Sequence, residues 1–196
     1  MSSAWKLPDT LTVNGRDMAI RTDYRDILEI LRACSDPELP SWARTEVMLK
    51  ILYVDFDTLK PEELQEAADK AVAFIDNGSE ADQDPKRPSP RLMDWEQDAE
   101  LIVPAINRVA NCGDIRSLSY LHWWTFLGYY MEIGECLFSS VLNIRYKRAH
   151  GKKLDKWEKD FEKENRRLIS LKKTMSETEK QKLREEKAAV DALFGL

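Results

Sequence analysis

The sequence predicts a mainly α-helical protein, with a compact helical domain, a small N-terminal β-hairpin and an extended amphipathic helical arm at the C-terminus. Apolar residues recur every three or four positions through most of the chain, an Asn-Gly pair near the N-terminus separates two short alternating stretches, and the sequence becomes strongly charged from Lys152 onward. Of the 196 residues, 43% are hydrophobic, which is enough for one core. We therefore expect a body at residues 1–150 and an arm at residues 151–196.

The hairpin is predicted at residues 10–21. Asn14 and Gly15 both tolerate positive φ, which a two-residue type I′ turn requires. The flanking stretches Thr10–Val13 and Asp17–Ile20 alternate as strands do. Because an isolated hairpin is only marginally stable in water, we expect this one to pack against helices.

Three helices are expected after the hairpin. The first begins at Thr22 or Asp23, either of which can cap a helix, and carries an apolar stripe over its next turns. The second runs from residue 41 to about residue 54. Pro61 suits the first turn of the third, which ends near Gly78.

The stretch Gly78–Arg91 contains three prolines and almost no apolar residue. Such a segment cannot bury enough surface to order itself, so it is predicted to be a mobile loop. Beyond it, Asp94 and Gln97 form a capping pair for the next helix. Pro104 lies within that helical pattern and predicts a kink or a break near Val103.

The stretch "YLHWWTFLGYY" predicts a central aromatic helix at about residues 117–132, with a further helix after Gly134. Apolar residues lie on most sides of this helix, which is typical of a helix with several neighbours. Gly128 would be explained by a neighbouring backbone packed closely against it, and an exposed peptide-binding groove is the alternative to a core. The predicted structural core residues are Trp95, Leu121, Trp123, Trp124, Leu127 and Gly128.

The predicted arm carries a narrow apolar stripe among many charged residues. Ser176 to Glu179 reads as a capping box, which predicts a separate last helix to about Phe194. Helices this polar are stable mainly when their stripe meets a partner. The partner-binding candidates are Arg145, Lys147, Arg148, Leu154, Trp157, Phe161, Arg166, Arg167, Leu168 and Leu171.

Charge is distributed unevenly. Arg145–Lys173 holds 12 basic and 5 acidic residues, whereas residues 1–144 carry a formal charge of -11. A basic segment can bind nucleic acid by releasing counterions from phosphate, so a nucleic-acid-binding accessory protein that uses residues 145–173 is the alternative function. The acidic residues within the segment and the sequence pI of about 5.3 make that alternative the weaker one.

No motif indicates an enzyme. His122 and His150 are the only histidines, and neither they nor the three cysteines show metal-ligand spacing. His122 is most simply a partly buried residue with one hydrogen-bonded nitrogen. The sequence has no glycine-rich phosphate loop, no cofactor motif and no apolar run of the ~20 residues that a membrane span needs. We therefore expect a non-enzymatic protein without metal, cofactor or membrane contact.

Several stretches together resemble the bacteriophage gene-product-fifteen family. In order they are "VNGRDMAIRTDYRDIL", "DPEL", "FIDNG", "RLMDWEQDAELI", "LHWWTFL" and "LNIRYKR", covering roughly residues 5–150. The most specific pair is the D-x-E-Q-D element (Asp94, Glu96, Gln97, Asp98) together with the H-W-W element (His122, Trp123, Trp124).

The resemblance implies a mostly helical protein similar to siphophage tail assembly chaperones. Its implied partners are the tape-measure protein and, as a second candidate, the tail tube protein; a homo-oligomer is a further alternative. It implies action in the host cytoplasm and absence from the mature virion. From the residues alone, the sequence supports a helical interaction protein.

Overall fold

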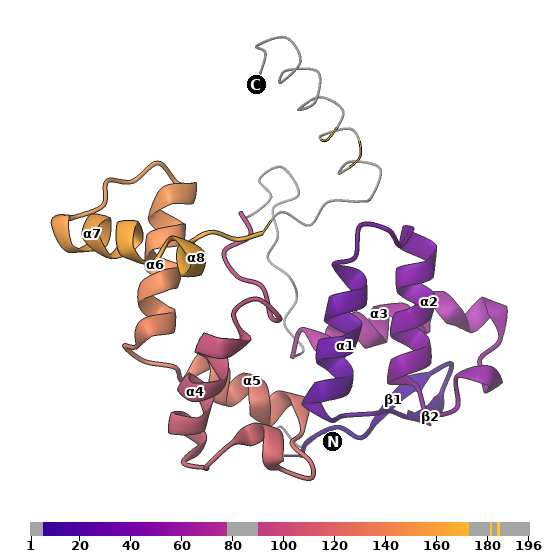
Figure 1. The fold of residues 1–196 in the computed structure, drawn as a ribbon. Helices are drawn as coiled ribbons and strands as arrows, with labels where there is room; N and C mark the ends of the chain where they lie inside the picture. The colour runs from indigo at the N-terminus through magenta and orange to yellow at the C-terminus, as the bar shows by residue number, and fades with distance from the viewer. Residues whose placement is uncertain (1–5, 78–89, 173–180, 182–183, 185–196) are drawn as a thin grey trace.

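The computed structural model describes residues 6–77, 90–172, 181 and 184. Within them the chain is mainly α-helical and has one two-stranded antiparallel hairpin, as the sequence predicts (Figure 1). Almost all of the predicted loop at 78–91 lies outside the described residues, and so does most of the predicted last helix from Ser176 to about Phe194.

The hairpin pairs β1 (Thr10–Val13) with β2 (Arg16–Ala19), with Thr10 opposite Ala19. Asn14 and Gly15 both have positive φ, at 48° and 73°, as a type I′ turn requires. Ile20 then forms an isolated bridge with Tyr53, which joins the hairpin to the end of the second helix.

Glu63 fixes the hairpin to the body. It ends the short helix η2 (Pro61–Glu63), and its carboxylate accepts a hydrogen bond from Asn14 Nδ2 at 3.0 Å and pairs with Arg16 at 2.7 Å. The hydrogen bond from the Lys60 amide and the one from Asn14 hold the pKa of Glu63 below its ordinary value.

The next helices form an antiparallel pair over a third helix. The pair is α1 (Tyr24–Cys34), capped by Asp23, and α2 (Ser41–Leu52). After the short helix η1 (Phe56–Thr58), α3 (Leu64–Ile75) packs against α2 and β1. Inward-facing apolar residues of all three helices are fully buried, so this region is held together mainly by the hydrophobic effect.

The second half of the body contains α4 (Ala99–Ala110), the short helix η3 (Ile115–Ser117), α5 (Trp123–Met131) and α6 (Leu137–Ala149). The sequence predicts a kink or a break near Val103, and the break is not found, because α4 runs through Pro104 without interruption. Pro104 is exposed, so the Glu100 carbonyl that it cannot pair with lies on the outer side of the helix.

The aromatic helix α5 is shorter than the predicted range of about 117–132. Its first residue is Trp123, because the residues before it are extended and bind to the start of α1. The Tyr24 amide donates to the Leu121 carbonyl at 2.9 Å, and the Trp123 amide donates to the Thr22 carbonyl at 2.7 Å.

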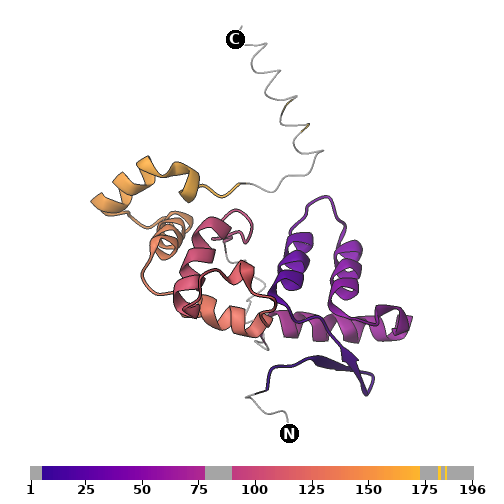
Figure 2. The same cartoon turned by 60° about the horizontal axis from the view of Figure 1, so that its bottom comes forward.

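The chain after α6 folds back on the body. The helices α7 (Lys156–Glu164) and α8 (Arg166–Ile169) lie beside α6 in both ribbon views (Figures 1 and 2). Leu154 and Ile169 are only 4% and 8% exposed and belong to the hydrophobic core. The expectation of an extended arm beginning at residue 151 is therefore wrong for residues 151–172, because this segment buries apolar side chains on the body.

Candidate partner-binding surfaces

His122 has a structural role. It caps α5, since its Nδ1 accepts a hydrogen bond from the Trp124 amide at 3.0 Å. Its Nε2 lies 3.0 Å from the Pro8 carbonyl oxygen. A neutral imidazole with the proton on Nε2 satisfies both contacts, so His122 joins the N-terminal segment to the aromatic helix.

The two tryptophans that follow His122 cap another helix. The Trp123 indole N–H donates to the Ile75 carbonyl and that of Trp124 donates to the Phe74 carbonyl, each at 2.8 Å. These carbonyls belong to the end of α3, where a helix leaves its last C=O groups without intrahelical partners. The H-W-W element therefore holds α3 and α5 together, whatever partner the protein binds.

The structure places the predicted core residues in different environments. Leu121 and Trp123 are buried, whereas Trp95, Trp124 and Leu127 are partly buried and pack against the core. Gly128 is exposed, and a Cβ built there would meet nothing within 4 Å, so its assignment to the core is wrong. No close backbone approach requires a glycine at this position.

The D-x-E-Q-D element also builds the fold. The Asp94 carboxylate accepts hydrogen bonds from the amides of Glu96 and Gln97 at 3.0 and 2.6 Å. The Asp94 amide donates to the Asp98 carboxylate at 2.9 Å. These bonds shape a turn that brings Asp98 inward, and α4 begins directly after it.

Arg145 forms a buried ion pair with Asp98 and is only 5% exposed. Two guanidinium N–H groups reach the two carboxylate oxygens at 2.7 and 2.8 Å. The remaining three donate to the carbonyls of Leu92, Leu168 and Ile169 at 2.9, 2.5 and 3.0 Å. All five donors are therefore used, and the prediction that Arg145 binds a partner is wrong.

The side chain of Gln97 binds the backbone of the segment that follows α8. Its Nε2 donates to the Ser170 carbonyl at 2.7 Å, and its Oε1 accepts from the Lys172 amide at 2.9 Å. With the two bonds from Arg145, this makes residues 168–172 a docked segment. Neither contact could be read from the sequence, because each joins residues more than 20 positions apart.

Other basic residues of the predicted partner site are paired within the chain. Lys147 pairs with Glu158 and Arg148 with Glu162, so α6 and α7 are linked by charge. These partners hold the pKa values of both glutamates below their ordinary range.

Further along, Arg167 pairs with Glu100 of α4 at 2.9 Å. Together with the pairs of Arg145, Lys147 and Arg148, this internal neutralisation reduces the positive charge that the nucleic-acid alternative requires.

The outer side of α7 remains open. Trp157 is 58% exposed, and its ring stacks on that of Phe161, one turn along the helix, with 5.2 Å between ring centroids. By contrast, Leu154 is buried, whereas Leu168 and Leu171 are half-buried. Of the predicted stripe, Trp157 is therefore the side chain most accessible to a partner.

A groove of about 950 Å³ lies between α1 and the segment Arg91–Glu96. Leu28 and Leu31 contribute its apolar wall from α1, and Met93 and Trp95 contribute from the other side. The groove has no signal in the sequence, because its two walls are about 60 positions apart in the chain and come together only in the fold.

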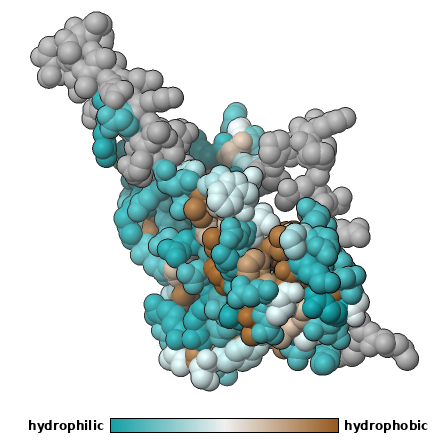
Figure 3. Space-filling view, turned by 90° about the vertical axis from the view of Figure 1, so that its right-hand side faces the viewer, coloured by the Kyte–Doolittle hydropathy of each residue, from teal (hydrophilic) through white to brown (hydrophobic). Residues whose placement is uncertain are grey.

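The start of α2 is the third accessible apolar surface. Trp42, in the first turn of the helix, is 69% exposed. The half-buried Val47 and Ile51 face other sides of α2, because successive residues turn by about 100°, and Val54 follows the end of the helix at Leu52. Figure 3 shows the molecule from the right-hand side of Figure 1, and there apolar side chains appear as patches among hydrophilic ones.

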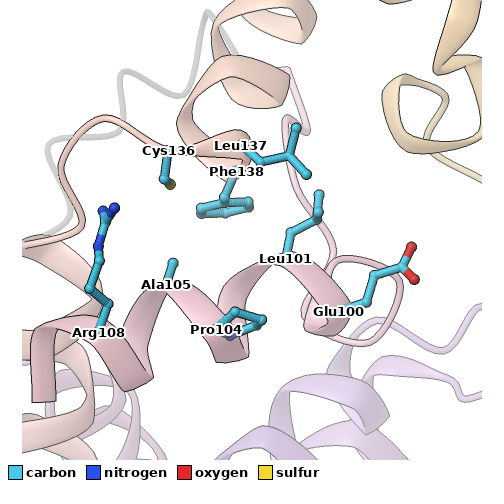
Figure 4. Close-up of a pocket in the computed structure, with 8 residues that line it drawn as sticks. All are labelled: Glu100, Leu101, Pro104, Ala105, Arg108, Cys136, Leu137 and Phe138. Carbon is cyan, nitrogen blue, oxygen red and sulfur yellow. The ribbon is translucent and has the colours of Figure 1, made fainter. Parts of the chain in front are cut away.

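A smaller pocket of about 200 Å³ lies between α4 and the start of α6 (Figure 4). Leu101, Ala105 and Phe138 give it a mainly apolar lining, and Glu100 and Arg108 lie at its two ends. Its chemistry indicates no reaction. Among the described residues, no group of three or more His, Cys, Asp or Glu side chains is placed to hold a metal ion.

No helix in the described part of the chain is long and apolar enough to span a membrane. The model of the family described as Bacteriophage Gp15 protein matches residues 5–174. The match includes α7 and α8, beyond the residues on which the resemblance was based. No curated protein and no solved structure matches the chain.

Proposed function

Because this chain belongs to the Bacteriophage Gp15 protein family, we propose that it is a tail assembly chaperone-like protein that covers the tape-measure protein during tail morphogenesis. Family membership indicates a phage structural or assembly-related protein. The proposed role is non-enzymatic, takes place in the host cytoplasm and ends before the virion is mature. The tail tube protein is a possible second partner.

The physical need for such a protein follows from the shape of its proposed partner. A long rod-like helical protein exposes apolar stripes until the tail tube closes around it, and such stripes aggregate. A chaperone must cover them reversibly. Rapid release favours several modest contacts over one tight site, because differences in affinity lie mainly in the dissociation rate.

The exposed Trp42 at the start of α2 is the observation that supports this role most strongly. Tryptophan is among the residues that most often anchor interfaces, and Trp42 is 69% exposed on a helix whose other side is buried in the core. A helical partner could pack an apolar side chain against this ring without disturbing the fold. We therefore assign the tape-measure contact to the surface around Trp42 at the start of α2.

Co-expression with the tape-measure protein of the same phage tests the proposal. We expect the full chain to raise the soluble fraction of the tape-measure protein and Trp42→Ala to lose most of that effect. Met131→Ala is the matched control, because Met131 is also 69% exposed but lies on α5. Equal solubility with and without the chain would contradict the chaperone role. An unchanged effect of Trp42→Ala would contradict the assignment to α2.

A further inference from the structure

The groove between α1 and the segment Arg91–Glu96 has apolar walls that the core holds in place. The Trp95 ring packs on the aromatic cluster, with 5.0 Å between its centroid and that of Tyr130 and 6.2 Å to that of Trp123. Further half-buried apolar side chains complete the lining: Leu28, Leu31, Pro37 and Met93. Because the core fixes one wall and a helix forms the other, little has to be ordered when a partner binds.

The rim of this groove is acidic. Its charged lining residues are four carboxylates and two guanidinium groups: Glu29, Asp36, Asp94, Glu96, Arg32 and Arg91. Arg32 pairs with Glu29 on the α1 wall. Arg91 pairs with Asp94 on the opposite wall. Both arginines are therefore already neutralised by carboxylates of the groove itself, and the lining keeps a formal net charge of -2.

The two remaining carboxylates lie on opposite sides of the groove. Among the described residues, neither Asp36 nor Glu96 has an ion-pair partner within 4 Å. Two charged residues adjoin the lining, Lys172 through its carbonyl and Glu38 through its amide, and their charges offset each other. The α1 helix ends at Cys34, so the negative end of its dipole lies on the same side as Asp36. The rim therefore favours a cationic partner and repels phosphate-bearing ones.

The shape of the groove favours a helix over an extended peptide. Its α1 wall runs from Leu28 to Ser35, which is about two turns at 3.6 residues per turn. A helix laid along such a wall inserts apolar side chains spaced three, four and seven positions apart. An extended peptide binds by adding a strand to a sheet edge, and neither β1 nor β2 lines the groove.

We propose that the groove between α1 and Arg91–Glu96 binds a basic amphipathic α-helix of a partner protein. The apolar side chains of that helix pack between Leu31 and Trp95, and the lysines or arginines beside them pair with Asp36 and Glu96. Trp42, to which we assign the tape-measure contact, does not line this groove. The groove is therefore a second docking site that goes beyond the proposed function, and its test does not need the tape-measure protein.

Fluorescence anisotropy with two labelled synthetic peptides tests this inference on the full chain. Each peptide is a helix of about five turns with a leucine stripe, flanked by lysines in the Lys peptide and by glutamates in the Glu peptide. We expect the parent to bind the Lys peptide at least about tenfold more tightly than the Glu peptide, and raised salt to narrow the difference. Replacing the leucines of the Lys peptide with serines should abolish binding.

Two charge-matched variants separate the groove from the overall charge of the protein. E29K/E96K changes one exposed residue on each wall and should bind the Glu peptide more tightly than the Lys peptide. E62K/E132K changes the net charge equally, at exposed residues outside the groove, and should keep the preference of the parent. Circular dichroism of both variants checks that the fold is kept.

Amide hydrogen exchange of the parent then locates the bound peptide. We expect the Lys peptide to slow exchange in residues 91–96, because the helix covers that wall. Equal affinity for the two peptides, or loss of the preference in E62K/E132K as well, would overturn the proposal. So would unchanged exchange in residues 91–96. Exchange there that slows without peptide as the protein concentration rises would overturn it too, because a second copy would then be the occupant.

Discussion

The helices α5 and α7 both carry tryptophan, yet their tryptophans lie in opposite environments. In α5 the indole N–H groups of Trp123 and Trp124 donate to the last carbonyls of α3. In α7 the Trp157 ring is 58% exposed and stacks on Phe161 of the same helix. The H-W-W element that carries much of the family resemblance therefore joins α3 and α5 inside the protein. The surface open to partners lies elsewhere.

The basic residues show the same contrast. Arg145 is enclosed by a carboxylate and three carbonyls, whereas Arg166 is exposed on α8. Arg145→Ala should lower the free energy of unfolding by about 3–5 kcal/mol, because it leaves the buried Asp98 carboxylate with the Asp94 amide but without the opposite charge of the guanidinium. Urea unfolding followed by circular dichroism measures this. Arg166→Ala is the control and should stay within about 0.5 kcal/mol of the parent. A loss below about 1 kcal/mol for Arg145→Ala would mean that the ion pair is not formed in solution.

Matched substitutions at the two kinds of tryptophan sharpen the comparison. Trp123→Ala should cost about 3–5 kcal/mol of stability, because it leaves a cavity and removes a cap from α3. Trp157→Ala should cost less than about 0.5 kcal/mol, because its ring is already largely in water. The same urea experiment, read by circular dichroism, compares them. Similar losses of stability for the two variants would contradict the distinction between the buried Trp123, which caps α3, and the exposed Trp157.

The link between α6 and α7 should depend on pH. The hydrogen bond from Lys147 holds the pKa of Glu158 below the ordinary 4.5 in the folded state. Stability from this contact is therefore present above the unfolded pKa and is lost as pH falls through the lower folded pKa. Glu158→Gln should destabilise the protein at neutral pH. As the pH is lowered, the unfolding midpoint of the variant should fall less steeply than that of the parent. A parallel acid dependence for the parent and the variant would show that Glu158 does not contribute.

A substitution at Gly128 should have the smallest effect on stability, and it should stabilise the protein where the others destabilise it. The position is exposed and helical, and a Cβ would meet nothing within 4 Å. Gly128→Ala should therefore stabilise the protein by about 0.5–1 kcal/mol. The thermal midpoint should rise by roughly 2–4 °C per kcal/mol for a chain of this size. A fall in the midpoint would indicate a close neighbour at this position after all.

The sequence predicted the elements better than their contacts. The Asn14-Gly15 turn, the Asp23 cap and the helical stripes depend on local chemistry, and each is found in the structure. The break predicted near Val103 and the close packing predicted at Gly128 are not found, and both Pro104 and Gly128 face outward.

Long-range contacts account for the remaining differences. The charged segment from residue 151 onward was expected to extend away from the body because its composition is polar. Its docking depends on backbone carbonyls bound by Arg145 and Gln97, and hydropathy contains no signal for such bonds. The groove beside α1 was missed for the same reason, since its walls meet only in the folded chain.

Amide hydrogen exchange of the full chain tests most directly whether residues 151–172 belong to the body. Exchange reports local opening, so a docked segment is protected and a free arm is not. We predict that peptides covering residues 154–172 are protected in the parent. They should lose protection in Gln97→Ala, while those from α1 to α3 keep it. Exchange of residues 154–172 at the rate of an unfolded peptide in the parent would contradict the account, because the segment would then be a free arm.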